Sequence, residues 1–232
     1  GRLGIAYTAW NPAGYSGDTS DTRCAYIKFH YSTDNGTAWS AAVDAWSLGT
    51  GVSVGNTYRT INLNWVSSVN QFYLTVECFG YTATVDGTQN AIACIGKAST
   101  NGGVTWGTQT RIDPAVSTMY YFFPNVETDM LGNLVLFFYE RDSGDAAQDR
   151  DATYKYYNGA WSAMRTVWDT TDNLMVPQTA VSTQGVNGNR AYGAYLKGAH
   201  TDGDRELYMT WTDNPNANPP TFVTGYGPYG PV

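Results

Sequence analysis

The chain has 232 residues, enough to bury a substantial core, and its composition excludes a disordered, collagen-like or coiled-coil protein. Its formal charge of -7 argues against binding to nucleic acid, which requires clustered lysine and arginine. The apolar runs fall short of the roughly 18 residues of a membrane span. We therefore expect neither nucleic acid as a partner nor insertion into a membrane.

The residue types favour strands throughout. Tyr, Trp, Phe, Thr, Val and Gly are abundant, whereas Lys, Glu and Leu are sparse. This balance is typical of half-buried strands joined by tight turns. The sequence therefore predicts an all-β protein, with residues 1–232 as a single domain. A first residue other than Met is expected of a processed chain or of a segment of a longer one.

Four segments share one plan: a β-rich run, an acidic or polar loop, a second β-rich run, and a turn that ends at an aromatic residue. The paired runs are residues 3–10 and 25–32, 72–79 and 91–98, 133–140 and 153–157, and 191–197 and 206–211. The closing aromatics Trp39, Trp106, Trp161 and Phe222 lie 67, 55 and 61 residues apart. This spacing predicts four blades of a β-propeller, each with four antiparallel strands.

Further strands are expected beside these pairs. Residues 57–66, 121–128 and 175–182 precede the second, third and fourth pairs, and residues 41–47 and 108–112 follow the first and second. The first repeat lacks a preceding strand. Either residues 221–232 supply it and close the ring, or the four blades are part of a larger ring.

Two of the turns, residues 32–39 and 99–106, fit the pattern Ser-x-Asp/Asn-x-Gly-x-x-Trp. An Asp or Asn in a turn accepts hydrogen bonds from nearby amides, a Gly adopts positive φ, and the Trp packs under the turn. We therefore expect a structural role for the eight motif residues Ser32, Asp34, Gly36, Trp39, Ser99, Asn101, Gly103 and Trp106.

This motif, repeated at the same place in successive segments, resembles the Asp box of the sialidase-like (bacterial neuraminidase repeat) propellers. The resemblance implies blades with Asp-box turns. Members of the family include sialidases, other exo-glycosidases, and non-catalytic domains of adhesins and phage tail proteins, so the fold alone does not choose a function. The third turn lacks the Asp, and the fourth is degenerate.

If the chain is an enzyme, the resemblance implies arginines that bind a substrate carboxylate, a Tyr nucleophile beside a carboxylate, and an acid/base. The densest ionisable cluster is Tyr139, Glu140 and Arg141, and Glu77 occupies the position equivalent to Tyr139 in the second repeat. These four residues are the catalytic candidates. The family's Arg-Ile-Pro motif is absent and only four repeats are visible, which counts against a complete sialidase site. The alternative for Glu77 is an exposed acid at a strand end.

The loops between the paired runs form a second candidate site. They hold nine of the 20 acidic residues, and equivalent loops emerge on the same face of a propeller. Asp142, Asp145, Asp149 and Asp151 are the densest set and suit Ca²⁺; the alternative is an acidic, solubilising surface. The aromatic residues at or beside these loops would stack on sugars: Trp10, Tyr15, Phe79 and Tyr81.

Two cysteines flank the loop of the second repeat. Cys78 and Cys94 lie on paired runs at similar distances from the loop midpoint. Both a cross-strand disulfide and two buried free thiols are compatible with these positions.

Taken together, the sequence favours a non-catalytic propeller module that recognises a glycan or another cell-surface ligand. Such a module belongs to a secreted or virion protein of the tail or adhesin type, at the cell exterior or virion surface. One alternative is a sialidase-like exo-glycosidase. The other is a purely structural assembly protein, forming a homo-oligomer or part of a larger assembly through open sheet edges. Converging arginines with paired carboxylates would indicate the enzyme, and aromatic shelves without them the binder.

Overall fold

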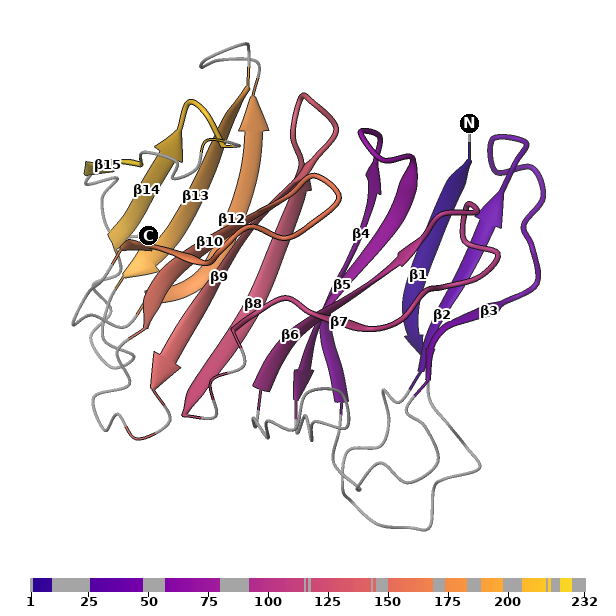
Figure 1. Ribbon diagram of the computed structural model, residues 1–232, viewed down its shortest axis with the longest axis horizontal. Coiled ribbons are helices and arrows are strands. Elements are labelled where there is room, and N and C mark those ends of the chain that lie inside the picture. The colour runs from indigo at the N-terminus through magenta and orange to yellow at the C-terminus, as the bar shows by residue number, and fades with distance from the viewer. Residues whose placement is uncertain are drawn as a thin grey trace. The chain divides into compact units, whose positions relative to one another are not determined.

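A computed structural model of the chain confirms the all-β prediction. It describes residues 2–9, 26–47, 57–79, 92–114, 116, 118–142, 144, 150–168, 174–182, 189–197, 206–215, 217 and 222–226. The strands of this part form four antiparallel sheets (Figure 1). The same residues contain no helix long and apolar enough to cross a membrane.

Within each sheet, strands that follow one another in the chain are neighbours. The first sheet is β1 (Leu3–Ala9), β2 (Tyr26–Ser32) and β3 (Val43–Ser47). The second is β4 (Thr57–Val66), β5 (Gln71–Phe79), β6 (Ile92–Ser99) and β7 (Thr110–Arg111). The third is β8 (Met119–Thr128), β9 (Leu134–Asp142), β10 (Asp151–Tyr157) and β11 (Arg165–Trp168). The fourth is β12 (Leu174–Ser182), β13 (Arg190–Lys197), β14 (Glu206–Thr212) and β15 (Val223–Tyr226).

The predicted pairs of runs are the pairs β1–β2, β5–β6, β9–β10 and β13–β14. One expectation is corrected. Residues 223–226 pair with β14 as the last strand of the fourth sheet, so they do not supply the strand before β1. Among the described residues the first sheet therefore has three strands, and the edge of β1 carries no neighbour within that sheet.

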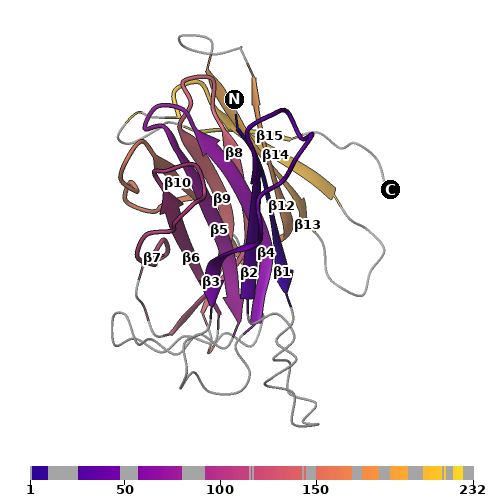
Figure 2. The same cartoon turned by 90° about the vertical axis from the view of Figure 1, so that its right-hand side faces the viewer.

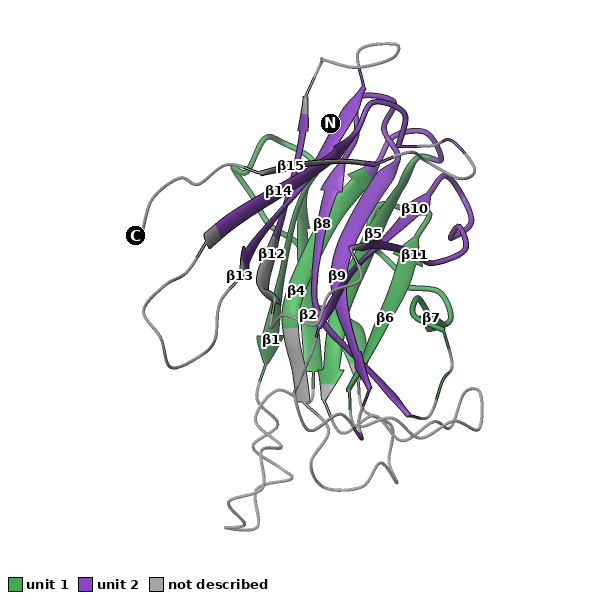
Figure 3. Ribbon diagram, turned by 90° about the vertical axis from the view of Figure 1, so that its left-hand side faces the viewer, with its two compact units in different colours: residues 1–65, 70–117 green, residues 66–69, 118–232 purple. Residues whose placement is uncertain are grey.

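The described chain divides into two compact units, coloured in Figure 3. The first holds residues 1–65 and 70–117, with the first and second sheets. The second holds residues 66–69 and 118–232, with the third and fourth sheets. In the second unit the turn after β4 is bonded to the turn after β8, since Ser68 N donates to Gly132 O at 3.1 Å.

Side chains in the first unit alternate between the two faces of each strand, and one face of each sheet meets in a core. Ile27 and Phe29 of the first sheet pack with Phe72, Leu74 and Val76 of the second. All five are at most 4% exposed. Face-to-face packing of the two sheets is therefore the main source of stability in this unit.

The second unit repeats this arrangement with larger aromatic side chains. Phe137 and Tyr139 of β9 and Tyr154 of β10 pack against Ala191 and Tyr195 of β13. The Phe137 ring lies 5.1 Å from Tyr154 and 6.3 Å from Tyr195, both in inclined geometries that aromatic pairs prefer. Gly193 allows this close packing, because a Cβ there would lie 2.8 Å from the Phe137 ring.

The two motif turns have matching hydrogen bonds. In the first, Asp34 Oδ1 accepts from Ala38 N at 2.9 Å, and Ser32 Oγ accepts from Gly36 N at 2.8 Å. In the second, Asn101 Oδ1 accepts from Thr105 N at 2.9 Å, and Ser99 Oγ accepts from Gly103 N at 2.8 Å. Each turn is therefore held by its own side chains.

The glycines and tryptophans of these turns differ in their surroundings. Gly36 and Gly103 have φ of 89° and 91°, which favours glycine. Gly103 also lies against the Phe29 ring, 1.9 Å from where a Cβ would be, so no larger residue fits. Trp106 packs on the same Phe29 ring at 5.2 Å, whereas Trp39 is 40% exposed.

The register of β5 and β6 separates the two described cysteines. Cys78 pairs with Ala93, and Cys94 pairs with Glu77, so the two sulfur atoms belong to opposite faces of the second sheet. Both cysteines are free and buried, which corrects the disulfide alternative. Burial, with a smaller contribution from the Glu77 carboxylate, raises the pKa of the Cys78 thiol to about 12.

We expect Ser99→Ala to lower the free energy of unfolding by about 1–2 kcal/mol, because the buried Gly103 amide loses its acceptor. Urea unfolding measures the change. Asp34→Asn is the matched control and should be near neutral, since Asn101 fills the same role in the second turn. Equal stability of the two variants would contradict the assigned role of the serine.

We expect alkylation of the native protein at mildly alkaline pH to leave Cys78 and Cys94 unmodified. The pKa of Cys78 is raised and both thiols are buried, so little thiolate forms or is reached. Peptide mapping by mass spectrometry, with protein alkylated in urea as the reference, measures the modification. A non-reduced peptide linking the two cysteines would be the contrary result.

Candidate binding site

The ends of β9 and β10 bring two arginines together. Tyr139 and Arg141 are two residues apart on β9, so they lie on the same face of the third sheet. Asp151 of β10 pairs with Glu140, and the next step along the ladder brings Arg150 opposite Arg141. Burial and, to a smaller extent, the positive charge of Arg141 lower the pKa of Arg150.

An aromatic surface from β8 lies under both guanidinium groups. The Cζ of Arg141 is 5.3 Å from the Tyr120 ring centre and 5.5 Å from that of Phe122. The Cζ of Arg150 is 5.6 Å from the Phe122 ring centre. Such contacts stabilise a cation over a ring and hold the planar groups in place. The strand β8 therefore acts as a platform for the two arginines.

A β-bulge shapes this platform. The register of β8 shifts between Phe122, which pairs with Tyr139, and Asn125, which pairs with Phe137. Within the bulge Phe123 has φ of 49°, in the left-handed region that few bulky residues adopt. Its ring is 39% exposed and lies 6.4 Å from Tyr139, edge to face. The bulge thus adds an exposed aromatic ring to the site.

Two buried tyrosine rings are neighbours in the core of the second unit. Tyr139 and Tyr195 are fully buried, and their ring centres are 5.9 Å apart. Neither hydroxyl has a hydrogen-bond partner among the described residues. Burial raises the pKa of both phenols, so both remain protonated at neutral pH.

The Nε atoms of Arg141 and Arg150 are buried and have no hydrogen-bond partner within the described part of the chain. Burial is the larger cause that lowers the pKa of Arg150, ahead of the Arg141 charge. Like charges that face each other across strands are unfavourable. The cluster therefore places two neighbouring positive charges beside two Nε donors that have no acceptor among the described residues, an environment that an anion would stabilise.

Glu140 does not join this cluster. As the residue between Tyr139 and Arg141, it lies on the opposite face of the third sheet. It is 7% exposed, and its Oε1 accepts from Thr166 Oγ1 at 3.4 Å. Of the three adjacent catalytic candidates, the structure thus brings Tyr139 and Arg141 together on one face.

Glu77 is in the first unit. It pairs with Cys94 on β6, just as Tyr139 pairs with Ala152 on β10, which agrees with their equivalence in the repeats. Glu77 is 2% exposed, so it is not an exposed acid at a strand end. Glu77 is therefore a buried acid within the sheet.

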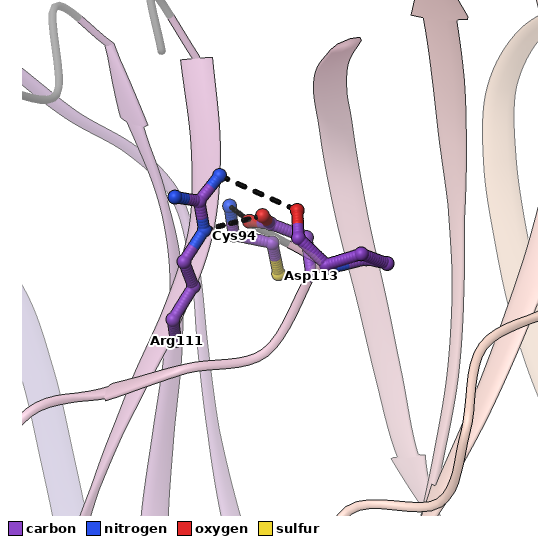
Figure 4. Close-up of polar contacts among 4 residues, drawn as sticks. Cys94, Arg111 and Asp113 are labelled. Carbon is purple, nitrogen blue, oxygen red and sulfur yellow. Dashed lines mark hydrogen bonds and ion pairs between the residues drawn. The ribbon is translucent and has the colours of Figure 1, made fainter. Parts of the chain in front are cut away.

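A buried ion pair missed by sequence reasoning lies on the same sheet as Glu77. Arg111 Nε donates to Asp113 Oδ1 at 2.6 Å, and Cys94 N donates to Asp113 Oδ2 at 2.5 Å (Figure 4). The two charged side chains are 7% and 0% exposed. Arg111 Nη2 also reaches Pro114 O at 3.5 Å. This pair continues the bonding of β6 past the end of the short strand β7.

The proposed calcium and sugar-stacking residues fall largely outside the described ranges. Trp10, Tyr15, Tyr81, Asp145 and Asp149 lie there, and so does the side chain of Phe79, the last residue of β5. Asp142 Oδ1 accepts from Gly144 N at 2.8 Å, and Asp151 begins β10. The described residues alone contain no group of three or more His, Cys, Asp or Glu that could hold a metal ion. The Ca²⁺ site remains a prediction.

Solved structures resemble the chain in fold. Neither a protein-family model nor a curated protein sequence matches it. The chain is similar to the NanB sialidase from Streptococcus pneumoniae (TM-score 0.56, 10% identity, 98% of this chain and 50% of that one). It is also similar to the α-L-arabinanase of Penicillium chrysogenum (TM-score 0.51, 14% identity, 99% and 69%). A third similar structure is the Hadza microbial sialidase Hz136 (TM-score 0.52, 14% identity, 81% and 40%).

The chain therefore has a sialidase-like β-propeller fold, which confirms the prediction made from its repeats. It spans 40% of the Hadza sialidase and half of NanB. At identities of 10–14% the likeness is one of fold, and the function has to be argued from the side chains.

We expect Asp113→Asn to lower the free energy of unfolding by about 3 kcal/mol, because it leaves the Arg111 charge buried without its carboxylate. Asparagine keeps an acceptor for the Cys94 amide. The double variant Arg111→Met with Asp113→Asn should recover most of the loss, since neither member of the pair then carries a buried charge. Urea unfolding of the wild type and the three variants forms a double-mutant cycle. A coupling energy near zero would mean that the pair does not act as a unit.

Proposed function

We propose that the chain is a non-catalytic glycan-recognition module that binds a carboxylate-bearing saccharide at Arg141 and Arg150. One observation carries the proposal: two adjacent guanidinium groups have buried Nε donors without acceptors in the described part of the chain. Guanidinium groups recognise planar carboxylates through paired hydrogen bonds. A bound carboxylate would supply acceptors and offset both the burial and the Arg141 charge, which together lower the pKa of Arg150.

The surrounding aromatic rings suit the rest of a sugar. Phe122 is half-buried and Phe123 is 39% exposed, and their rings lie 6.2 Å apart in a stacked arrangement. Apolar sugar faces pack on such rings, while the charged substituent reaches the arginines. The Tyr139 hydroxyl, on the same face of β9 as Arg141, adds a donor that has no partner among the described residues. These features support an acidic sugar over a simple inorganic anion.

Binding without hydrolysis is supported by the surroundings of Tyr139. A tyrosine nucleophile needs a nearby base to take its proton. Burial raises the pKa of Tyr139, and Glu140 lies on the other face of the sheet. No described carboxylate forms a hydrogen bond with the phenol. The phenol is therefore suited to donate a hydrogen bond to a ligand and not to attack it.

Similar structures support a saccharide as the ligand class, since two of them are sialidases and one is an arabinanase. For the same reason the second candidate is an exo-glycosidase at this site. We further propose that the module acts outside the cell or on a virion, where acidic glycans of cell surfaces are within reach.

We expect Arg150→Met to weaken binding of sialyllactose by about tenfold or more, the effect of losing one charge-assisted contact. Titration calorimetry measures the affinity, with neutral lactose as the ligand control. Arg165→Met, on the outer strand β11 of the same sheet, is the matched protein control and should bind as the wild type does.

The same variants separate binding from structure. Without ligand, Arg150→Met should be at least as stable as the wild type, because methionine keeps the contact with Phe122 and removes a repelled charge. Equal affinity for lactose and sialyllactose would contradict recognition of the carboxylate. Turnover of fluorogenic sialosides or arabinosides that is lost in Tyr139→Phe would establish the exo-glycosidase instead.

A further inference from the structure

The bulge in β8 puts one more residue on this strand than on its partner. β8 is an edge strand of the third sheet and pairs with β9 (Figure 2). Between the regular pairs on either side of the bulge, Phe123 and Pro124 lie opposite the single residue Phe138. A proline suits such a position because it has no N–H group to leave unpaired. The bulge is therefore a defined feature made of two residues.

The bulge brings two successive aromatic side chains to one face of the sheet. Successive residues of a regular strand point to opposite faces. Phe122 pairs with Tyr139 and shares its face, yet the Phe123 ring stacks on Phe122 at 6.2 Å. The same ring meets Tyr139 edge to face at 6.4 Å. Phe123 is thus on the face that carries Arg141 and Arg150, here called the arginine site.

The backbone of Phe123 is strained. Its φ of 49° lies in the left-handed region, which crowds the Cβ of an L-residue. Pro124 follows and favours an extended conformation at the residue before it, which adds to the cost. The Phe123 ring is 39% exposed, so burial offsets only part of this cost. Backbone strain of this kind is concentrated at functional sites.

The irregular backbone and the aromatic side chain have separate explanations. The register of β12 also shifts, between Met175 and Gln178, and Thr60 of β4 has φ of 46°. An irregular first strand hence recurs in the second, third and fourth sheets and belongs to the architecture. The recurrence does not account for a phenylalanine at position 123, because glycine would keep the same backbone at a lower cost.

We propose that Phe123 is a specificity-determining residue of the arginine site, where its ring packs on the apolar face of the sugar that carries the carboxylate. The inference rests on the proposed function, since it takes the carboxylate to lie on the two guanidinium groups. Both of these groups contact the Phe122 ring, and Phe123 extends this surface by a second, exposed ring. A small organic acid uses the arginines alone, so the Phe123 ring favours saccharides over such acids.

Titration calorimetry with sialyllactose tests the proposal. Phe123→Gly and Phe123→Ala should each bind it about fivefold more weakly than the wild type, the effect of losing one aromatic contact. Pyruvate carries a carboxylate but no sugar, so as a competitor it should show the same affinity for the wild type and both variants. Leu131→Ala, which removes an exposed apolar side chain from the turn after β8, is the matched control and should bind as the wild type does.

Urea unfolding without ligand tests the strain by itself. Phe123→Gly should unfold at a higher urea concentration than Phe123→Ala, because alanine keeps a Cβ in the left-handed region and glycine does not. Within a regular strand the order is the reverse, since glycine is less stable there than alanine. An alanine variant at least as stable as the glycine variant would overturn the assigned strain.

Failure of this inference is distinguishable from failure of the proposed function. A wild type that does not bind sialyllactose would overturn both. Wild-type affinity retained in Phe123→Gly and Phe123→Ala would overturn the role of Phe123 alone and leave the arginines in place. Two further results would also overturn that role: pyruvate that does not compete with sialyllactose for the wild type, and variants that lose pyruvate and sialyllactose to the same extent.

Discussion

The alternation of side chains along strands whose two faces are both buried is the constraint on which this protein depends. Phe137 and Phe138 are adjacent on β9, point to opposite faces and are both fully buried. A strand in such a position has no place for a charged group along most of its length. The charged residues Arg141 and Arg150 accordingly lie at the ends of β9 and β10. They are on the same face as the aromatic core.

The central strands could be predicted from sequence because each shows a long run of β-forming residues. The outer strands were harder. Arg165–Trp168 and Val223–Tyr226 have four residues each, too few for alternation to be recognised, and one of the two alternatives placed the second strand beside the first repeat. Their pairing depends on the neighbouring strand and not on their own pattern. The motif turns, in contrast, are local structures, so Asp34 and Ser99 could be identified from spacing alone.

Only part of the candidate site could be predicted from the sequence. Tyr139 and Arg141 were identified with Glu140 as one dense cluster, but proximity in sequence does not give proximity on a strand, because each step reverses the face. Arg150 was overlooked, since its neighbours Asp149 and Asp151 make that stretch appear acidic. Only the pairing of β9 with β10 brings Arg150 to Arg141. A prediction that carried the hairpin register through the loop would have found it.

The bulge at Phe123 has a consequence for how the site can change over evolution. The extra residue puts the two ends of β8 out of phase, so Tyr120 and Phe122 share a face with the arginines independently of the residues after the bulge. Beyond it, Asn125 is tied to Thr179 of β12 by two hydrogen bonds of 2.8 Å each. Substitutions before the bulge, at Tyr120 or Phe122, can thus alter ligand preference. The part of β8 after the bulge meanwhile keeps its hydrogen bonds to β12. Loss of a single residue between them would remove the bulge and its exposed Phe123 ring, while both halves would keep their partners on β9 and their faces.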